Sequence, residues 1–366
     1  MKKRIVAVLL SGCMVASLLA GCGGKKDDAA AGSTAADSGS GDGYHFEVVV
    51  KSFQSTYWQA AIQGMDQAKD ELGITYNATG PNAESDIADQ VNMLNNAINA
   101  NPDGIALAAC DQSAVLDSLQ TALDKKIPVV CFDTTVPDAP EGSVYSNVVT
   151  DNGGAGAIAG EKLYEAVKDQ LGKGTVRVGE VNQDATAANI TERGMGFINK
   201  FKELAEADSY KVAVIGNDYY VGKVENNAAE ADADIIIEVA VPAQTTVDLC
   251  TTEASNIMNK DDTIAIFGSN QVSAEGVLAA NANLNVLGDK ILAAGFDAGT
   301  AQKAAVKDGT LLGSVTQSPL MMGKGAIETL AKICDGEDVE MDQPTDAAWY
   351  DADNMDDADI APNLYD

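Results

Sequence analysis

Polar and aromatic side chains recur at the positions where apolar runs of this sequence end. The residues concerned are carboxylates, amides, aromatics, one threonine and one lysine: Lys51, Phe53, Tyr57, Trp58, Asp133, Thr134, Asn182, Gln183, Asn270, Gln271, Asp297 and Gln317. Carboxylates and amides form the paired hydrogen bonds that vicinal hydroxyl groups require, and aromatic rings pack against the C–H faces of a sugar ring. Together these side chains predict a site for a neutral, polyhydroxylated small molecule.

Several of these residues also have a purely structural interpretation. Asp133 and Asp297 could cap the helices that follow them, and Trp58 could belong to the core. Neither alternative explains why acids, amides and aromatics gather at the ends of successive apolar runs. The two aspartates could also mimic the acid and base of a glycosidase. Both are expected to ionise in a polar, hydroxyl-binding site, so we do not expect an enzyme.

The histidine and cysteine content excludes other kinds of chemistry. The single histidine, His45, rules out the usual Ser-His-Asp and Cys-His mechanisms and a His-rich metal site. No CxxC spacing occurs, and we expect neither a metal nor a cofactor. Residues 154–159 fit a loose G-x-G-x-x-A dinucleotide pattern, but close helix packing explains these small residues better. The thiol state of the cysteines at 110, 131, 250 and 334 stays open.

Apolar runs alternate with segments of helical period, which predicts an α/β protein. Strands are expected at 46–50, 74–79, 105–109, 129–132, 175–181, 235–241, 264–267, 291–296 and 311–315, and helices at 58–72, 87–98, 115–123, 158–171 and 190–204. Near-continuous apolar strands are typical of a parallel sheet that is covered on both faces. Because the pattern restarts after Asp151, we expect two lobes. Residues 212–234 are expected to hold a strand and a surface excursion.

The net negative charge limits the kinds of molecule that the protein can bind. The formal net charge is −31, with 55 acidic and 24 basic residues. Such a surface repels the phosphates of nucleic acids and of anionic membranes. Within the acidic C-terminus, residues 351–362 faintly resemble a calcium-binding loop, but they lack its central Gly and its closing Glu.

The first 43 residues read as an export and anchoring segment. Three basic residues precede a short apolar run, so residues 1–21 are expected to be a signal peptide. Leu19 to Cys22 resembles the bacterial lipobox, in which the Cys is acylated with palmitate and becomes the new N-terminus. Residues 22–43 then form a flexible linker on a lipid anchor. We therefore expect the protein on the extracytoplasmic face of the cell membrane.

Four motifs follow this segment in a fixed order, each occurring once. They are Asp151-Asn152 with Gly160, Arg193-Gly194-Met195-Gly196-Phe197, Gly295-Phe296-Asp297, and Gln317-Ser318-Pro319 through Gly323. From about Phe46 to the C-terminus the chain thereby resembles the ribose-type (type I) periplasmic-binding-protein family, the sugar-binding lipoproteins of ABC importers. The resemblance implies two Rossmann-like lobes with parallel sheets, joined by a three-segment hinge. The expected N-terminal lobe is 44–149 plus 318–345, and the expected C-terminal lobe is 150–317 plus 346–366.

The resemblance also implies a function and a set of ligand-binding residues. A monomer would capture a small neutral sugar or polyol between the lobes and deliver it to an ABC permease in the membrane. A sensor that feeds a membrane signalling protein is the open alternative. The positions that match the family's motifs are Tyr57, Trp58, Asp133, Arg193, Asn270, Asp297 and Gln317.

Three departures put ribose itself in doubt. Ribose-binding members place an Arg where this chain has Thr134, a second Arg where it has Thr191, and a Phe near Gln244 or Thr245. Lys51 could supply a substitute donor. A lysine at this position resembles the branch of the family that includes autoinducer-2 and rhamnose receptors, so the ligand stays open.

Overall fold

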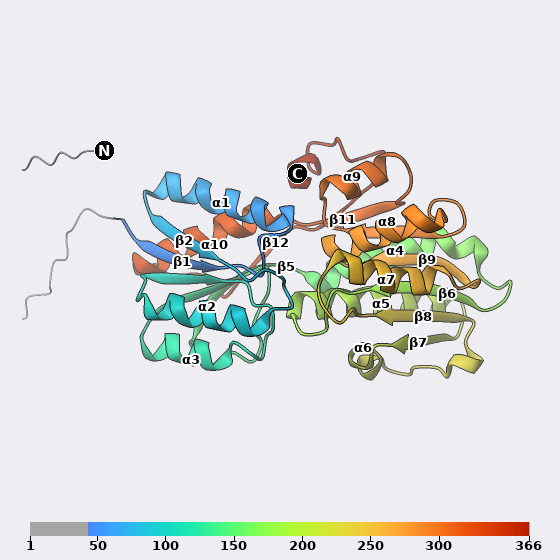
Figure 1. The fold of residues 1–366 in the computed structure, drawn as a ribbon, viewed down its shortest axis with the longest axis horizontal. Helices are drawn as coiled ribbons and strands as arrows, with labels where there is room; N and C mark the ends of the chain where they lie inside the picture. Colours follow the sequence, from blue (N-terminus) through green and yellow to red (C-terminus); the bar gives the residue numbers. More distant parts are fainter. Residues whose placement is uncertain (1–42, 366) are drawn as a thin grey trace, which may run out of the picture. The chain divides into compact units, whose positions relative to one another are not determined.

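A computed structural model describes residues 43–365 of the 366-residue chain, and these fall within one compact unit (Figure 1). The predicted signal peptide, the acylation of Cys22 and the linker up to residue 42 lie outside the described residues. Within this unit the strands form two separate sheets. We call each sheet, together with the helices that pack on it, a lobe.

The N-terminal lobe has a parallel sheet of the order β12-β5-β4-β3-β1-β2. Its strands are β1 (His45–Val49), β2 (Thr75–Thr79), β3 (Gly104–Leu107), β4 (Val129–Phe132), β5 (Val144–Thr150) and β12 (Asp342–Thr345). Its helices are α1 (Thr56–Leu72), α2 (Ile87–Asn99), α3 (Leu116–Asp124) and α10 (Pro319–Cys334). The pair α1 and α10 covers one face and the pair α2 and α3 the other (Figure 1). Every residue of β3 and β4 is therefore buried.

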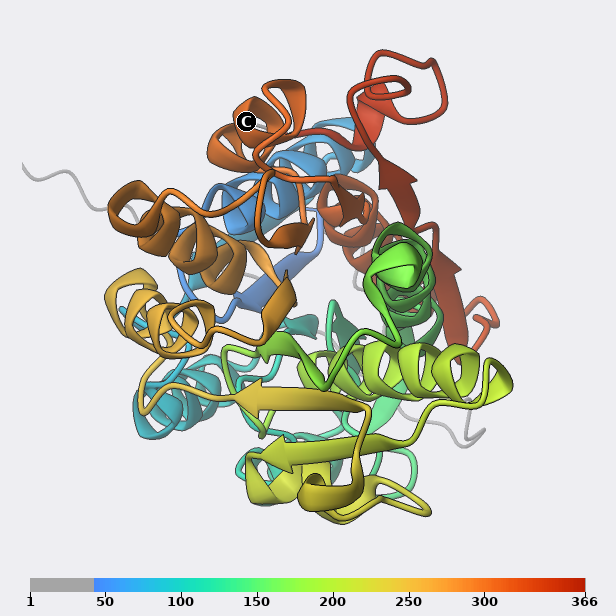
Figure 2. The same cartoon turned by 90° about the vertical axis from the view of Figure 1, so that its right-hand side faces the viewer.

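The C-terminal lobe repeats this plan with a sheet of the order β13-β11-β10-β9-β6-β8-β7 (Figure 2). Its strands are β6 (Val176–Val181), β7 (Val212–Gly216), β8 (Ile235–Ala240), β9 (Thr263–Gly268), β10 (Leu292–Phe296), β11 (Gly313–Thr316) and β13 (Ala348–Tyr350). Its helices are α4 (Asn152–Val167), α5 (Ala188–Ala207), α6 (Asp218–Lys223), α7 (Val247–Met258), α8 (Gln271–Leu284) and α9 (Thr300–Lys307). Neighbouring strands are parallel except β13, which is antiparallel to β11. The predicted α/β fold class is confirmed.

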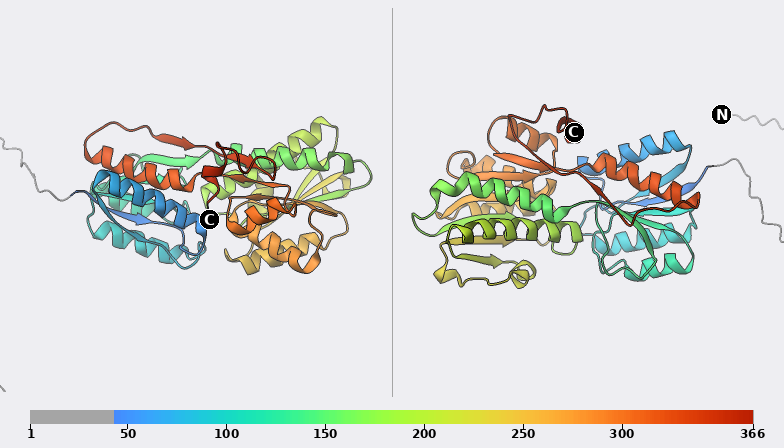
Figure 3. Two further views of the ribbon diagram at one scale, coloured as in Figure 1. Left: turned by 90° about the horizontal axis from the view of Figure 1, so that it is seen from above. Right: turned by 180° about the vertical axis from the view of Figure 1, so that it is seen from behind.

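The described chain passes between the lobes three times: from β5 to α4, from β11 to α10, and from β12 to β13. The three crossings lie side by side (Figure 3). Thr150 on the first crossing donates a hydrogen bond to Gln317 Oε1 on the second at 3.0 Å. Its hydroxyl oxygen also lies 3.2 Å from that of Thr345 on the third. Side-chain contacts thus join all three crossings.

Glycines allow the helices of each lobe to pack with their backbones in contact. A Cβ atom at Gly64 of α1 would lie 1.9 Å from the backbone oxygen of Leu320 in α10. A Cβ atom at Gly156 of α4 would lie equally close, 1.9 Å, to the backbone oxygen of Arg193 in α5. Neither position can hold a larger residue without a backbone shift. The interpretation of the glycines at 154–159 as helix-packing residues, rather than as a dinucleotide motif, is thus confirmed at Gly156.

Some elements differ from the sequence-based expectation. Helix α4 begins at Asn152 rather than at 158, because Asp151 caps it by accepting a hydrogen bond from Gly154 N at 2.9 Å. Strands β5, β12 and β13 were not predicted from the sequence. Strand β12 carries Pro344 and no apolar pattern, as an edge strand permits. Residues 212–234 hold the expected strand, β7, followed by the short helix α6.

The C-terminal segment after β13 contacts both lobes. The Tyr365 ring lies edge-on to the Tyr57 ring of α1, with 5.9 Å between centroids. The Tyr365 hydroxyl also accepts a hydrogen bond from Ala298 N of the C-terminal lobe at 3.4 Å. Within residues 43–365 no group of three or more His, Cys, Asp or Glu side chains could hold a metal ion, the 351–362 segment included.

Candidate functional site

A cavity lies between the two lobes at the carboxyl ends of their parallel strands, where α/β sheets bind ligands. It is lined by Lys51, Ser55, Tyr57, Trp58, Glu84, Asp133, Gln183, Asn189, Ile190, Arg193, Asn270, Gln271, Val272, Asp297 and Gln317. The cavity has a volume of only about 20 Å³, which is room for a single water molecule. Polar side chains from the two lobes therefore meet each other here.

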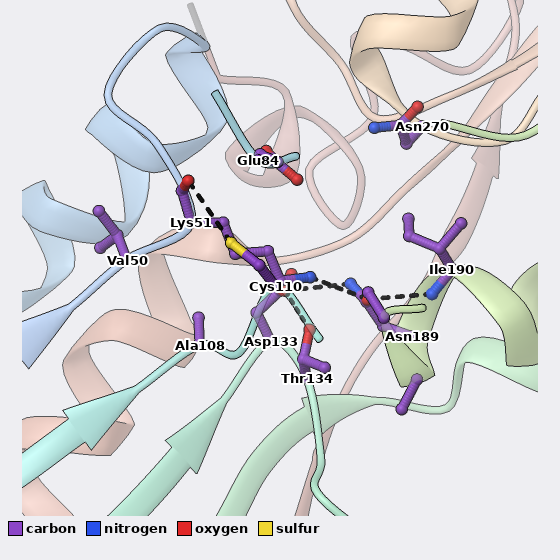
Figure 4. A network of polar contacts seen from close by, with 12 residues as sticks. Val50, Lys51, Glu84, Ala108, Cys110, Asp133, Thr134, Asn189, Ile190 and Asn270 are labelled. Atoms are coloured by element: carbon purple, nitrogen blue, oxygen red, sulfur yellow. Dashed lines mark hydrogen bonds and ion pairs between the residues drawn. The ribbon is translucent and has the colours of Figure 1, made fainter. Parts of the chain in front are cut away.

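A lysine and an aspartate that line the cavity form a buried ion pair (Figure 4). Lys51 Nζ lies 3.0 Å from Asp133 Oδ2 and donates to Asn189 Oδ1 of α5 at 2.9 Å. Burial favours the neutral amine, but the negative charges of Asp133, Glu84 and Asp184 outweigh it and raise the pKa of Lys51. Asn189 also donates to Asp133 Oδ2 at 3.0 Å. The ammonium and the carboxylate of one lobe thus bind the same amide of the other lobe.

Asp133 follows β4 directly, and its backbone has a φ of 63°. Its carboxylate accepts hydrogen bonds from the Tyr57 hydroxyl at 2.5 Å and from Thr134 Oγ1 at 2.7 Å. Burial opposes ionisation, but Lys51 and these hydrogen bonds lower the pKa of Asp133 below its usual value. The site therefore presents a fixed carboxylate whose bonding partners are already in place.

Asp297 occupies the matching position after β10 in the C-terminal lobe, with a φ of 71°. Its carboxylate accepts from Gln317 Nε2 at 2.8 Å and from the backbone N–H of Gln271 at 2.9 Å. Burial raises the pKa of Asp297, although the positive charge of Arg193 and these hydrogen bonds lower it in part. Two aspartates in the left-handed conformation, which few non-glycine residues adopt, face the cavity from equivalent strand ends.

Glu84 connects an aromatic residue of the N-terminal lobe with the C-terminal lobe. Its Oε1 accepts from Trp58 Nε1 at 2.8 Å, and its Oε2 accepts from Gln183 Nε2 at 2.6 Å. Desolvation at the lobe interface raises the pKa of Glu84, although Lys51 and the two hydrogen bonds oppose this shift. Glu84 orients the Trp58 indole and holds it toward the cavity.

The amides that follow β9 complete the wall of the C-terminal lobe. Asn270 caps α8 by accepting from Ser273 N at 3.0 Å, and its Nδ2 donates to Gln183 Oε1. Gln271 reaches the N-terminal lobe, where its Nε2 donates to Thr56 Oγ1 at 3.0 Å and its Oε1 accepts from Tyr57 N at 3.3 Å. Capping and cavity lining are thus combined in the same short segment.

Arg193 lines the cavity but is held by its own lobe. Its guanidinium donates to Ser269 O and to Asn152 Oδ1, each at 2.8 Å, and lies 3.6 Å from the centroid of the Phe296 ring. This arrangement joins α4, α5, β9 and β10 behind the cavity. Arg193 therefore supports the wall and places a positive charge near Asp297.

Most of the sequence-predicted residues lie together. Eight of them line this cavity: Lys51, Tyr57, Trp58, Asp133, Arg193, Asn270, Asp297 and Gln317. Phe53, in the segment between β1 and α1, does not: it is 43% exposed. Thr134 is buried behind Asp133 and contacts its carboxylate rather than the cavity.

Several residues at or beside the site were not predicted, among them Glu84, Asn189 and Gln90. Glu84 lies in the loop after β2, and Asn189 lies in the first turn of α5. Gln90 is buried in α2, where its Nε2 donates to Val50 O at 3.1 Å and to Ala108 O at 2.9 Å, which joins the ends of β1 and β3. A polar residue on the apolar face of α2 is a sequence signal that could have revealed Gln90. Glu84 and Asn189 carry no such signal.

Comparison with known proteins agrees with this geometry. A family model described as periplasmic binding protein domain matches residues 46–338, well over half of the chain. The chain belongs to the periplasmic binding protein family. The described part of this periplasmic binding protein contains no helix that is long and apolar enough to cross a membrane.

Individual relatives of this periplasmic binding protein share about a quarter of its residues. The chain is 24% identical over 304 residues to the ribose import binding protein of Bacillus subtilis (strain 168), covering 83% of this chain and 86% of that protein. It is 26% identical over 301 residues to the ribose import binding protein of Escherichia coli (strain K12), covering 82% and 88%.

Solved structures share the fold over nearly the whole described chain. An ABC transporter solute-binding protein from Agrobacterium vitis with bound D-fucose has a TM-score of 0.74 at 27% identity, covering 88% of this chain and all of that one. An ABC transporter, LacI family transcriptional regulator, from Brachyspira murdochii has a TM-score of 0.72 at 30% identity, covering 89% of this chain and all of that one.

Proposed function

We propose that this periplasmic binding protein captures a neutral sugar or polyol between its lobes and delivers it to an ABC permease. The observation that carries the proposal is the matched pair of buried aspartates, Asp133 and Asp297, which face one cavity from equivalent strand ends. Around them lie amides, a tyrosine and a tryptophan, which suit the hydroxyl groups and C–H faces of a sugar. The D-fucose bound by the similar Agrobacterium vitis protein supports this ligand class.

Binding without bond cleavage fits the bonding of these carboxylates. Asp133 is paired with Lys51 and accepts from Tyr57, and Asp297 accepts from Gln317 and Gln271. Residues held in this way serve as hydrogen-bond acceptors rather than as a mobile acid and base. We therefore propose a receptor and not a glycosidase.

The position of the protein in the cell follows from the same proposal. Acylation of Cys22 would hold the receptor beside its permease, with residues 22–43 as the tether. The lobes would be the expected 44–149 plus 318–345 and 150–317 plus 346–366, working as a monomer. They would open and close about the three crossings, as hinged binding proteins do.

A thermal-shift screen of aldoses, polyols and autoinducer-2 tests the proposal. We expect at least one of these compounds to raise the unfolding midpoint, because a ligand that binds only the folded state stabilises it. Calorimetry on the responding compound should then give one site per chain. If no compound raises the midpoint, the sugar-receptor proposal is wrong.

A further inference from the structure

A second cavity adjoins the candidate site between the same two lobes. It has a volume of about 490 Å³, whereas the cavity around the aspartates has about 20 Å³. The two cavities share the residues Ser55, Glu84, Gln271 and Val272 in their walls. We call the larger one the outer chamber. It is formed by residues 52, 54–56 and 82–84 of the N-terminal lobe and by residues 245–248, 271, 272 and 275 of the C-terminal lobe.

The outer chamber is not a gap left by lobes that stand apart. The lobes are in contact in its wall, where Gln271 Nε2 donates to Thr56 Oγ1 at 3.0 Å. A second contact, Gln183 Nε2 to Glu84 Oε2 at 2.6 Å, closes the side toward the aspartates. Space of this size therefore remains while the lobes touch, and it falls in the range of ligand pockets, about 300–1,000 Å³.

The wall of the outer chamber indicates what it can hold. Most of its lining residues carry hydroxyl or amide side chains, including Ser52, Thr245, Thr246 and Asn82. Carboxylates come from Glu84, Asp248 and Glu275, and the lining residues, all within the described chain, include no Lys, Arg or aromatic residue. Such a wall suits a neutral group rich in hydroxyls, repels phosphate and uronate, and offers no face on which a nucleobase could stack.

We propose that the ligand is a neutral disaccharide or a related glycoside, with one ring at the aspartates and the second in the outer chamber. This inference rests on the proposed function and adds the size of the ligand to it. The inner ring would displace the contact of Lys51 with Asn189 and the contact of Gln317 with Asp297. The outer ring would fill space that already exists, bordered by Glu84 and Gln271.

Calorimetry with matched sugars tests the inference on the full chain. The probes are D-glucose with cellobiose, D-xylose with xylobiose, and D-galactose with lactose and melibiose. We expect one disaccharide to bind at least about tenfold more tightly than its constituent monosaccharide, because the second ring gains contacts of its own. If a monosaccharide binds as tightly as every disaccharide that contains it, the inference is overturned while the receptor proposal stands. If no probe of either size binds, the inference is overturned, and the receptor proposal is decided by the thermal-shift screen alone.

Two substitutions fill the chamber from opposite lobes. Ala83→Trp and Val247→Trp should each weaken disaccharide binding by about tenfold or more and leave monosaccharide affinity unchanged. The same Ala-to-Trp change at the exposed Ala207, at the end of α5, is the matched control and should alter neither. Retained monosaccharide binding shows that each variant is folded. Disaccharide affinity that survives both chamber variants would overturn the inference.

Discussion

Gln317 Nε2 donates a hydrogen bond to Asp297 Oδ1 at 2.8 Å. Gln317 lies on the second crossing between the lobes, and its Oε1 accepts from Thr150 of the first crossing. A carboxylate that lines the cavity is thus bonded to the segment about which the lobes would move. A ligand hydroxyl that takes the place of Gln317 at Asp297 therefore changes a contact within the hinge as well.

Replacing Asp297 by Asn should weaken sugar binding by about tenfold or more, because a neutral amide replaces a charged acceptor. Asn tolerates the φ of 71° at this position, so the substitution adds no backbone strain. It keeps one acceptor oxygen for the two donors Gln317 Nε2 and Gln271 N, so a loss of about 1 kcal/mol of unfolding free energy is expected. Asp297→Ala should lose binding as well and cost an additional ~1 kcal/mol of unfolding free energy, because Ala is strained there. Calorimetry and urea unfolding measure the two effects. Unchanged affinity in both variants would refute the role of Asp297.

Lys51→Met should be strongly destabilising, because it leaves the buried carboxylate of Asp133 without its cation. The expected loss of unfolding free energy is about 3 kcal/mol. Lys200→Met is the control, since Lys200 forms an exposed ion pair with Glu203 on one helix, for which the expected loss is below about 0.5 kcal/mol.

Urea unfolding at neutral pH compares the two lysine variants. Adding Asp133→Asn to Lys51→Met should restore part of the stability, because the unpaired charge is then gone. Equal losses for Lys51→Met and Lys200→Met would show that the buried pair has no special role.

Glu84→Ala should release the Trp58 indole, since Glu84 Oε1 is its hydrogen-bond partner. The sequence has two tryptophans, so Trp349→Phe leaves Trp58 as the fluorescent reporter. In that background Glu84→Ala should shift the emission to longer wavelength and weaken sugar binding by about tenfold, because a contact between the lobes is lost. Glu203→Ala, at an exposed position, should do neither. An unshifted spectrum would show that Glu84 does not hold Trp58.

The ends of buried strands could be read from the sequence because they combine two signals. A continuous apolar run such as 129–132 defines a strand buried on both faces, and the acid that follows it, Asp133, must then lie at the ligand-binding edge. Strand β5 and strand β12 lack that signal: their polar residues bond each other, as Asn147 Nδ2 does to Asp342 Oδ1 at 2.9 Å. Only the folded chain brings these two segments together.

Contacts between the lobes were beyond sequence reasoning for a related reason. The local sequence pattern around Asn189 and Glu84 predicts no function for either residue. Both bind a residue of the opposite lobe: Asn189 Oδ1 accepts from Lys51 Nζ at 2.9 Å, and Glu84 Oε2 accepts from Gln183 Nε2 at 2.6 Å. Local periodicity carries no information about how two lobes meet.

Glu180 should make stability depend on pH. It is fully buried in β6, its Oε1 accepts from Asn182, and its Oε2 has no partner among the described residues. Burial raises the pKa of Glu180 well above its usual value. Above a pH of about 4.3 the unfolded chain loses this proton while the native state keeps it. The free energy of unfolding therefore falls as pH rises toward the native pKa, by at most about 1.4 kcal/mol per pH unit.

Glu180→Gln removes this contribution. The unfolding free energy of the variant relative to the unsubstituted protein should therefore increase between about pH 5 and pH 7, as urea titrations at several pH values would measure. Glu203→Gln, on the exposed surface of α5, should leave the pH dependence unchanged. A difference that stays constant with pH would contradict the assignment of a native-state proton to Glu180.

The packing of α10 against α1 has a consequence for biosynthesis. The two helices touch at Gly64 and Leu320, so α1 packs on a helix that is synthesised more than 250 residues later. During translation the part of α1 that packs on α10 stays uncovered until residues 319–334 have been made. Fragments that stop before residue 319 would therefore expose that part of α1 to chaperones, proteases and one another.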